Sequence, residues 1–172
     1  PSFVGLINNE EIQKDFFSSP NYLNDIELIR AAYDAKLRLF DQEIGDLLNL
    51  YGDKDLQSNT IVILMGDHGE AIGEHNSFAH GETIYDEAIR FPLLIRVPWQ
   101  KEEVRLKDQI YQSKLSQLIY GLMRGDIFPN NFEASLKNIL STKTIFSRNC
   151  ANTTQGVRFD NRWKYIIDHR ND

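Results

Sequence analysis

The stretch that decides the fold is TIVILMGDHGEAIGEHNSFAHGETIYDEAIRFPLLIRVP, which runs from Thr60 to Pro98. It opens with an uninterrupted apolar run rich in β-branched residues, Ile61–Met65. A run of this length without polar alternation is typical of a strand covered on both faces, as the strands of a parallel sheet are. A second apolar run, Phe91–Ile95, predicts another strand near the end of the stretch.

Polar residues that could hold a metal ion follow the first of these runs. Gly66 ends the run, and Asp67 and His68 come next. In open α/β sheets, ligands bind beyond the carboxyl ends of the strands, and carboxylate and imidazole groups are ligands of divalent metals. Three of the four histidines lie in this stretch: His68, His75 and His80. The same Asp-His pair could instead cap a tight, glycine-rich turn, so spacing alone leaves both interpretations open and names no reaction.

Four short motifs follow one another here: GDHGE at 66–70, GEH at 73–75, HGETIYDEA at 80–88 and RFPLLI at 90–95. In this order they resemble the sulfatase branch of the alkaline phosphatase superfamily. The resemblance implies that Asp67 and His68 are ligands of one divalent cation, Ca²⁺ in the first place, with Mg²⁺ or Mn²⁺ as alternatives. It also implies that His80 stands where the family more often has a lysine that contacts the sulfate or phosphate of the substrate. His80 is therefore the candidate catalytic and substrate-binding residue.

A long helix is predicted before this stretch, from Asn24 to Gly52. Asn24 and Glu27 have the spacing of a capping box, and Gly52 suits the C-terminal end. Between them, apolar residues recur at helical spacing: Ile26, Ile29, Ala32, Tyr33, Leu37, Phe40, Ile44, Leu47 and Leu48. We expect this stripe to pack on the sheet.

Shorter elements are predicted in the rest of the chain. We expect helices at 83–88, 110–123 and 132–140, a strand at 144–146, and a hairpin of 156–159 and 162–167 around an Asp-Asn turn. Thr83 is the expected N-cap of the first of these helices. The resemblance implies an α/β fold. Residues 1–142 would hold part of an alkaline phosphatase-like parallel sheet with flanking helices, and 143–172 the start of a small antiparallel C-terminal subdomain.

Composition excludes few classes of function. The chain has 172 residues and a formal net charge of −6, which argues against a nucleic-acid surface. No apolar run is long enough to span a bilayer, and no secretory signal is visible. A single cysteine, Cys150, excludes an internal disulfide. The residues leave the compartment open, and the resemblance favours a periplasmic or extracellular enzyme.

The family's nucleophile is absent from these 172 residues. It lies in a Cys/Ser-x-Pro-x-Arg motif whose Cys or Ser becomes formylglycine, and Cys150 is followed by Ala-Asn-Thr instead. We therefore expect the formylglycine and the remaining acidic metal ligands to lie upstream, in an N-terminal half of the same enzyme. The chain by itself is then expected to be inactive.

The resemblance thus implies the C-terminal portion of a metal-dependent sulfuric ester hydrolase that acts on small-molecule or saccharide sulfate esters. Asp67 and His68 would hold the cation, and His80 would hydrogen-bond the anion or help to protonate the leaving oxygen. Two alternatives remain open. One is a phosphoester or phosphonate hydrolase, or a phosphoryl-group transferase, of the same superfamily. The other is a sulfatase-like module that has lost its chemistry.

Overall fold

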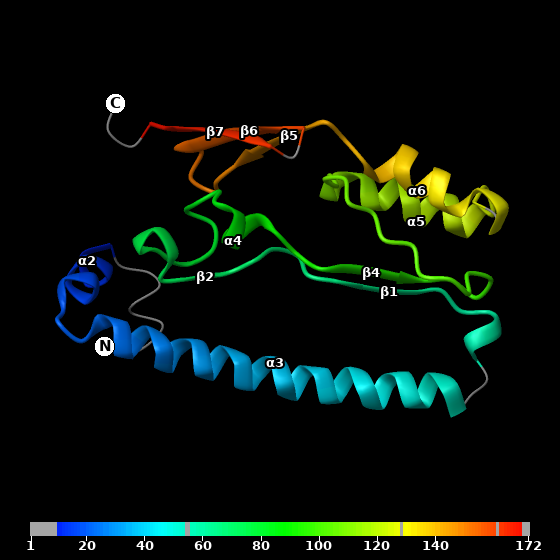
Figure 1. Cartoon of the computed structure of the whole chain (residues 1–172), viewed down its shortest axis with the longest axis horizontal. Coiled ribbons are helices and arrows are strands. Elements are labelled where there is room, and N and C mark those ends of the chain that lie inside the picture. Colours follow the sequence, from blue (N-terminus) through cyan, green and yellow to red (C-terminus); the bar gives the residue numbers. More distant parts are fainter. Residues whose placement is uncertain (1–9, 54–55, 128, 161, 170–172) are drawn as a thin grey trace. The chain divides into compact units, whose positions relative to one another are not determined.

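The computed structural model describes residues 10–53, 56–127, 129–160 and 162–169 (Figure 1). Helices and strands both occur, and they fall into two compact units, one ending at Arg96 and the other beginning at Val97. No helix in the described part of the chain is both long and apolar enough to cross a membrane. The candidate site lies entirely in the first unit.

Of the residues that the structure describes, those of the first unit begin with two helices, α2 (Glu10–Ser18) and α3 (Tyr22–Asp53). The tight turn between them is closed by the N–H of Tyr22, which donates to the carbonyl of Ser19 at 3.2 Å. The predicted long helix is confirmed, and Figure 1 shows it as one continuous rod. It begins two residues before the expected capping box. Helix α2 was not predicted, because its short sequence shows no sustained apolar period.

The core of the first unit lies where the start of α3 meets a short β-hairpin. Ile26 of α3 and Phe78 of the hairpin are buried. Residues packed against them are Phe16, Phe17, Tyr22, Ile29 and Ile72. The ring of Phe78 stacks on Phe17 and meets Phe16 edge to face, with centroids 5.2 Å apart in both pairs. Each such pair adds about 0.5–1.5 kcal/mol beyond the area it buries.

The rest of α3 carries an apolar stripe that the described residues leave uncovered. Leu37, Phe40 and Leu47 are 49%, 54% and 64% exposed. The expected packing of the whole stripe on the sheet is therefore wrong for the described residues, which bury the stripe only around Ile26. The physical reason is size: the two sheets found among the described residues of this unit have two strands each, too few to cover a helix of 32 residues.

The two apolar runs of the central stretch form strands β1 (Val62–Met65) and β4 (Leu93–Arg96). They pair antiparallel, from Val62 opposite Arg96 to Met65 opposite Leu93. All described strands pair antiparallel, so the predicted parallel sheet is not confirmed. The expected cover on both faces of the first strand is not seen in the described residues, where Val62–Leu64 are only half-buried and Met65 is exposed. An apolar run predicts a strand, but the direction of its neighbour depends on how the chain returns. Here the chain returns after residues 66–92 and runs back along β1.

Two short elements lie between these strands. Strands β2 (Ala71–Ile72) and β3 (Phe78–Ala79) form an antiparallel hairpin around a 3-10 turn, Glu74–Asn76. Helix α4 (Asp86–Ile89) follows, with Tyr85 rather than the predicted Thr83 at its N-cap. The reason is local: the Thr83 hydroxyl accepts the N–H of Tyr85 at 3.2 Å, which makes a turn before the helix begins.

The second unit contains two helices and a sheet of three strands. Its helices are α5 (Leu115–Arg124), preceded by a 3-10 turn, and α6 (Phe132–Leu140); its strands are β5 (Thr144–Arg148), β6 (Thr154–Phe159) and β7 (Trp163–Asp168). Both helices, β5 and the hairpin are confirmed, with α5 starting five residues later than expected. Of the predicted hairpin turn, Asn161 lies outside the described residues. The predicted domain boundary between residues 142 and 143 stays a prediction.

A matched pair of substitutions on α3 tests where the helix is anchored. Ile26→Ala should lower the free energy of unfolding by about 2–5 kcal/mol, because Ile26 is only 6% exposed in the core. Leu28→Ala should change it by about 0.5 kcal/mol or less, because Leu28 is 72% exposed. Urea denaturation followed by circular dichroism measures both. Similar small effects from the two would contradict the observed core.

Candidate functional site

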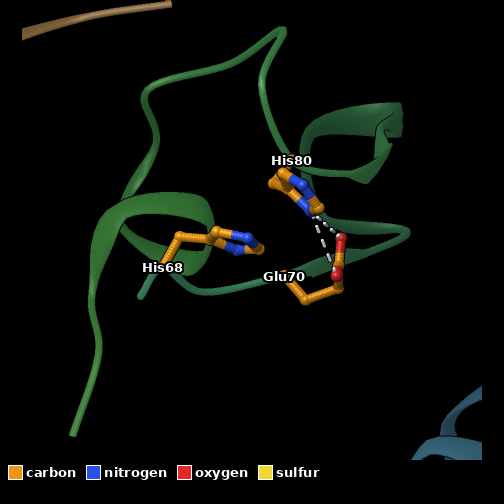
Figure 2. A group of neighbouring side chains, drawn as sticks. All are labelled: His68, Glu70 and His80. Carbon is orange, nitrogen blue, oxygen red and sulfur yellow. Dashed lines mark hydrogen bonds and ion pairs between the residues drawn. The ribbon is translucent and has the colours of Figure 1, made fainter. Parts of the chain in front are cut away.

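The candidate site contains four residues. Two of them follow β1, and the other two flank the β2–β3 hairpin at its open end. Asp67 and His68 follow β1, Glu70 directly precedes β2, and His80 directly follows β3. Figure 2 shows the side chains of His68, Glu70 and His80 converging. The chain therefore brings His80 to the predicted Asp67–His68 pair, although twelve positions separate the two histidines in the sequence.

The register of the hairpin explains why Glu70 and His80 meet. Ala71 pairs with Ala79, so Glu70 and His80 are the next opposing positions at the open end of the hairpin. Opposing residues of antiparallel strands have their Cβ atoms about 4.5–5.5 Å apart, within reach of these side chains. The Nδ1 atom of His80 lies 3.2 Å from Oε1 and 3.3 Å from Oε2 of Glu70. Because a carboxylate only accepts, this nitrogen donates and Nε2 stays available for a ligand.

The His68 ring is held by the backbone of the next residue, Gly69. Its Nδ1 lies 2.8 Å from the carbonyl oxygen of Gly69. A carbonyl only accepts, so Nδ1 carries a hydrogen, and in the neutral ring the lone pair is on Nε2. The ring centroids of His68 and His80 are 3.6 Å apart, with the planes tilted by 32°. The two histidines that sequence reasoning selected thus lie in one site.

Asp67 sits beside this group and is largely exposed. Its carboxylate accepts the backbone N–H of His68 at 3.1 Å, and its other oxygen lies 3.6 Å from Nε2 of His68. The side chain is 86% exposed. Carboxylate and imidazole are suitable donors for a divalent cation, and two of them would need further ligands to hold one tightly. Metal binding by Asp67 and His68 stays a prediction.

Gly69, the residue between His68 and Glu70, packs directly against the backbone of α4. The N–H of Gly69 donates to the carbonyl of Ala88 at 3.0 Å. A Cβ atom at position 69 would lie 2.0 Å from the carbonyl oxygen of Glu87 and 2.7 Å from that of Arg90. Only a residue without a side chain can approach the backbone so closely, so Gly69 fixes where the two flanking side chains start.

The β2–β3 hairpin holds residues in the left-handed region of backbone conformation, both in its turn and at the end of β3. His75 has φ 52° and Ala79 has φ 67°, each of which costs about 1–3 kcal/mol in a residue with a side chain. Contacts to α4 offset this strain at His75. Its Nδ1 lies 2.6 Å from Oε1 of Glu87, and its ring stacks on Tyr85 with centroids 3.6 Å apart. These contacts hold the turn, and with it the strand that leads to His80.

A second contact ties the turn to α3. One carboxylate oxygen of Glu74 pairs with Arg30 at 2.8 Å, and the other accepts the N–H of Ile72 at 2.6 Å. Burial opposes ionisation of this carboxyl. The backbone N–H groups of Ile72 and Glu74 and the charge of Arg30 outweigh that effect, so the pKa of Glu74 lies below its ordinary value.

Sequence reasoning missed Glu70. In the described part of the chain, His68, Glu70 and His80 each offer a ligand atom within 4.8 Å of the others, which makes them a group that could hold a metal ion. Glu70 can be recognised as a site residue only from the register of the hairpin, which places it opposite His80. Strands of two residues are too short to show alternation in the sequence, so this register could not be predicted.

Two glycine substitutions test the close approach at the site. Gly69→Ala should lower the free energy of unfolding by about 1–3 kcal/mol or more, since its Cβ would clash with backbone atoms that cannot rotate away. Gly45→Ala, in α3, should raise stability by up to about 1 kcal/mol, because nothing lies within 4 Å of its Cβ and alanine favours a helix. Denaturant titration of both variants checks this. Tolerance of alanine at both positions would show that the segment is not docked as described.

The lowered pKa of Glu74 predicts a pH dependence with a definite sign. Its carboxyl stabilises the fold above the unfolded pKa, about 4.3, and this contribution is lost as the pH falls through the lower folded pKa. In Glu74→Gln, stability should therefore fall less steeply with acid in that range. Arg30→Gln should give an intermediate slope, because both backbone donors remain. Denaturation curves at a series of pH values measure the slopes, and identical slopes would contradict the assignment.

Comparisons with known proteins agree on one family. Residues 8–125 match the sulfatase family model. Mouse iduronate 2-sulfatase is 39% identical over 70 residues, covering 41% of this chain and 12% of that protein. Mouse arylsulfatase K is 29% identical over 118 residues, covering 69% of this chain and 21% of that protein. An arylsulfatase of Clostridium perfringens is 33% identical over 69 residues, covering 40% of this chain and 14% of that protein.

No solved structure matches the chain significantly. The chain spans only about one eighth to about one fifth of the length of the three relatives named above. The family match itself extends over more than half of the chain and includes Asp67, His68, Glu70 and His80. The chain therefore belongs to the sulfatase family.

Proposed function

We propose that this chain is the C-terminal portion of a metal-dependent sulfatase that hydrolyses sulfate esters of small molecules or saccharides. Membership of the family supports the reaction class, and all three relatives named above are sulfatases by name. The observation that carries the proposal is the 3.6 Å separation of the His68 and His80 rings. It puts a predicted metal ligand and the predicted anion-binding residue in the same site.

In this proposal, Asp67 and His68 hold one divalent cation, Ca²⁺ in the first place, with Mg²⁺ or Mn²⁺ as alternatives. Carboxylate oxygens are favoured by these hard cations, and Nε2 of His68 has its lone pair free. When bound, such a cation acts as a Lewis acid toward the ester oxygens and the attacking group. Further ligands and a formylglycine nucleophile would come from an N-terminal half of the same enzyme.

His80 binds and orients the anionic group of the substrate. Its ring is 46% exposed, so an ester can reach it, and Glu70 holds Nδ1 so that Nε2 faces a ligand. An imidazole in this arrangement can donate a charge-assisted hydrogen bond to a sulfate oxygen or pass a proton to the leaving oxygen. Both roles use the ring with a hydrogen on each nitrogen, in which Nδ1 donates to Glu70 and Nε2 donates to the substrate.

The remainder of the enzyme would also complete the fold. The uncovered apolar stripe of α3 and the two-stranded sheet of β1 and β4 are what a larger α/β domain would cover and extend. We propose that strands of the N-terminal half provide the parallel sheet of an alkaline phosphatase-like fold. A periplasmic or extracellular location belongs to the same proposal and follows from family resemblance.

Substitutions of His80 in the longer enzyme test the role of this residue. A charge-assisted hydrogen bond contributes about 1.5–3 kcal/mol, so His80→Ala should lower kcat/KM for an aryl sulfate on the order of tenfold to a hundredfold. His80→Lys should recover part of the loss, because lysine can also bind the anion. Glu102→Gln, an exposed residue of the second unit, is the matched control and should leave kcat/KM unchanged. Equal losses from alanine and lysine, with a lower melting temperature, would assign His80 to holding the loop instead.

The isolated 172-residue chain provides a second test. Without the nucleophile and the remaining ligands it should not hydrolyse aryl sulfates at any concentration of Ca²⁺, Mg²⁺ or Mn²⁺. A colorimetric assay of the purified chain measures this. Metal-dependent turnover that Asp67→Ala abolishes would show that an N-terminal half is not required.

A further inference from the structure

We infer that His68, Glu70 and His80 form a binding site for a borderline transition metal of the Zn²⁺ type. Its ligand set differs from the Asp67–His68 pair proposed above for a hard cation, and it does not depend on the proposed reaction. The three residues supply ligand atoms that all lie within 4.8 Å of one another. Within the described residues, this group does not include Asp67.

The donors select the class of metal. Two imidazoles and one carboxylate are a ligand set typical of catalytic zinc sites, where a fourth position stays open to water or substrate. Hard cations such as Ca²⁺ prefer a shell of oxygen atoms, and this group offers oxygen from Glu70 alone. The group therefore suits Zn²⁺, Co²⁺ or Cu²⁺ better than the cations expected for the Asp67–His68 pair.

The distances suit a tetrahedral ion. Ligand bonds of about 2.0–2.2 Å at a tetrahedral angle place two donors roughly 3.4 Å apart. Nδ1 of His80 lies 3.2 Å and 3.3 Å from the two carboxylate oxygens of Glu70. A metal ion could thus replace the shared hydrogen between these groups with little movement of either side chain. The hairpin register holds the backbone of both residues in place.

His68 completes the group from the other side. Its Nδ1–H bond to the Gly69 carbonyl is the kind of outer contact that fixes the tautomer of a metal-bound histidine and leaves Nε2 to the metal. The rings of His68 and His80 are 38% and 46% exposed. These exposed side chains can rotate from their tilted arrangement, and an ion can enter from solvent.

Occupation of this group would have a consequence for the proposed reaction. The same Nε2 of His68 cannot serve a zinc ion and a hard cation at once. Zn²⁺ would then compete with Ca²⁺ and inhibit the longer enzyme rather than activate it. The binding itself can be measured on this chain without any assay of activity.

The test is titration of the chain with Zn²⁺, against a chromophoric chelator, and with Co²⁺, whose visible spectrum reports tetrahedral coordination. All variants carry Cys150→Ser, because the exposed thiol is a rival ligand. We expect one ion per chain and at least a tenfold loss of affinity, roughly, in Glu70→Gln and in His80→Ala. Glu70→His should retain zinc, since three histidines also form a zinc site.

Two controls make the result decisive. His75→Gln changes a histidine that pairs with Glu87 outside the group and should bind zinc like the parent. Glu102→Gln, which changes an exposed carboxylate of the second unit, should do the same. No binding of Zn²⁺, binding unaffected by Glu70→Gln, or a loss in His75→Gln as large as in His80→Ala would overturn the inference. Circular dichroism confirms that each variant is folded.

Discussion

The close approach of Gly69 to the backbone of α4 is the constraint on which the site depends. Its N–H donates to the Ala88 carbonyl, and no side chain fits between position 69 and the carbonyl of Glu87. His68 and Glu70 lie immediately on either side of this anchor. A docked backbone atom thus determines where an imidazole and a carboxylate begin, before any contact between the side chains is made.

The hairpin completes what the anchor begins. Because Ala71 pairs with Ala79, the chain returns His80 to a position opposite Glu70. Phe78, which directly precedes Ala79, is buried with Ile26 of α3, so the hairpin is attached to the core of its unit. The left-handed conformations of His75 and Ala79 are strained and persist because these surrounding contacts hold them. Packing energy in the core is thereby linked to the geometry of the site.

The elements that could be predicted from the sequence are those with a strong local pattern. The long helix α3 and the short helix α6 have regular apolar spacing, and both were located to within a few residues. The direction of the neighbour of β1 could not be predicted, because a buried apolar run looks the same in parallel and antiparallel sheets. The hairpin of β2 and β3 escaped notice because strands of two residues have no detectable period.

The short strands also explain why the site could be predicted only in part. Asp67, His68 and His80 could be selected because they lie in motifs that resemble a family, and the structure brings the two histidines together. Glu70 lies in the same motif, but its partner, ten residues away, depends on the unpredicted hairpin register. Acidic residues are common, so nothing in the sequence distinguishes Glu70 until the fold places His80 opposite it.

The Gly69 anchor and the hairpin bring His68 and His80 into contact within this chain. The most direct measurement is the nuclear Overhauser effect between their ring protons in an isotope-labelled sample, assigned with His68→Gln and His80→Gln. Rings with centroids 3.6 Å apart should give strong cross-peaks between these two histidines. Their absence, in a folded chain that still shows the contact between the rings of His75 and Tyr85, would contradict the account.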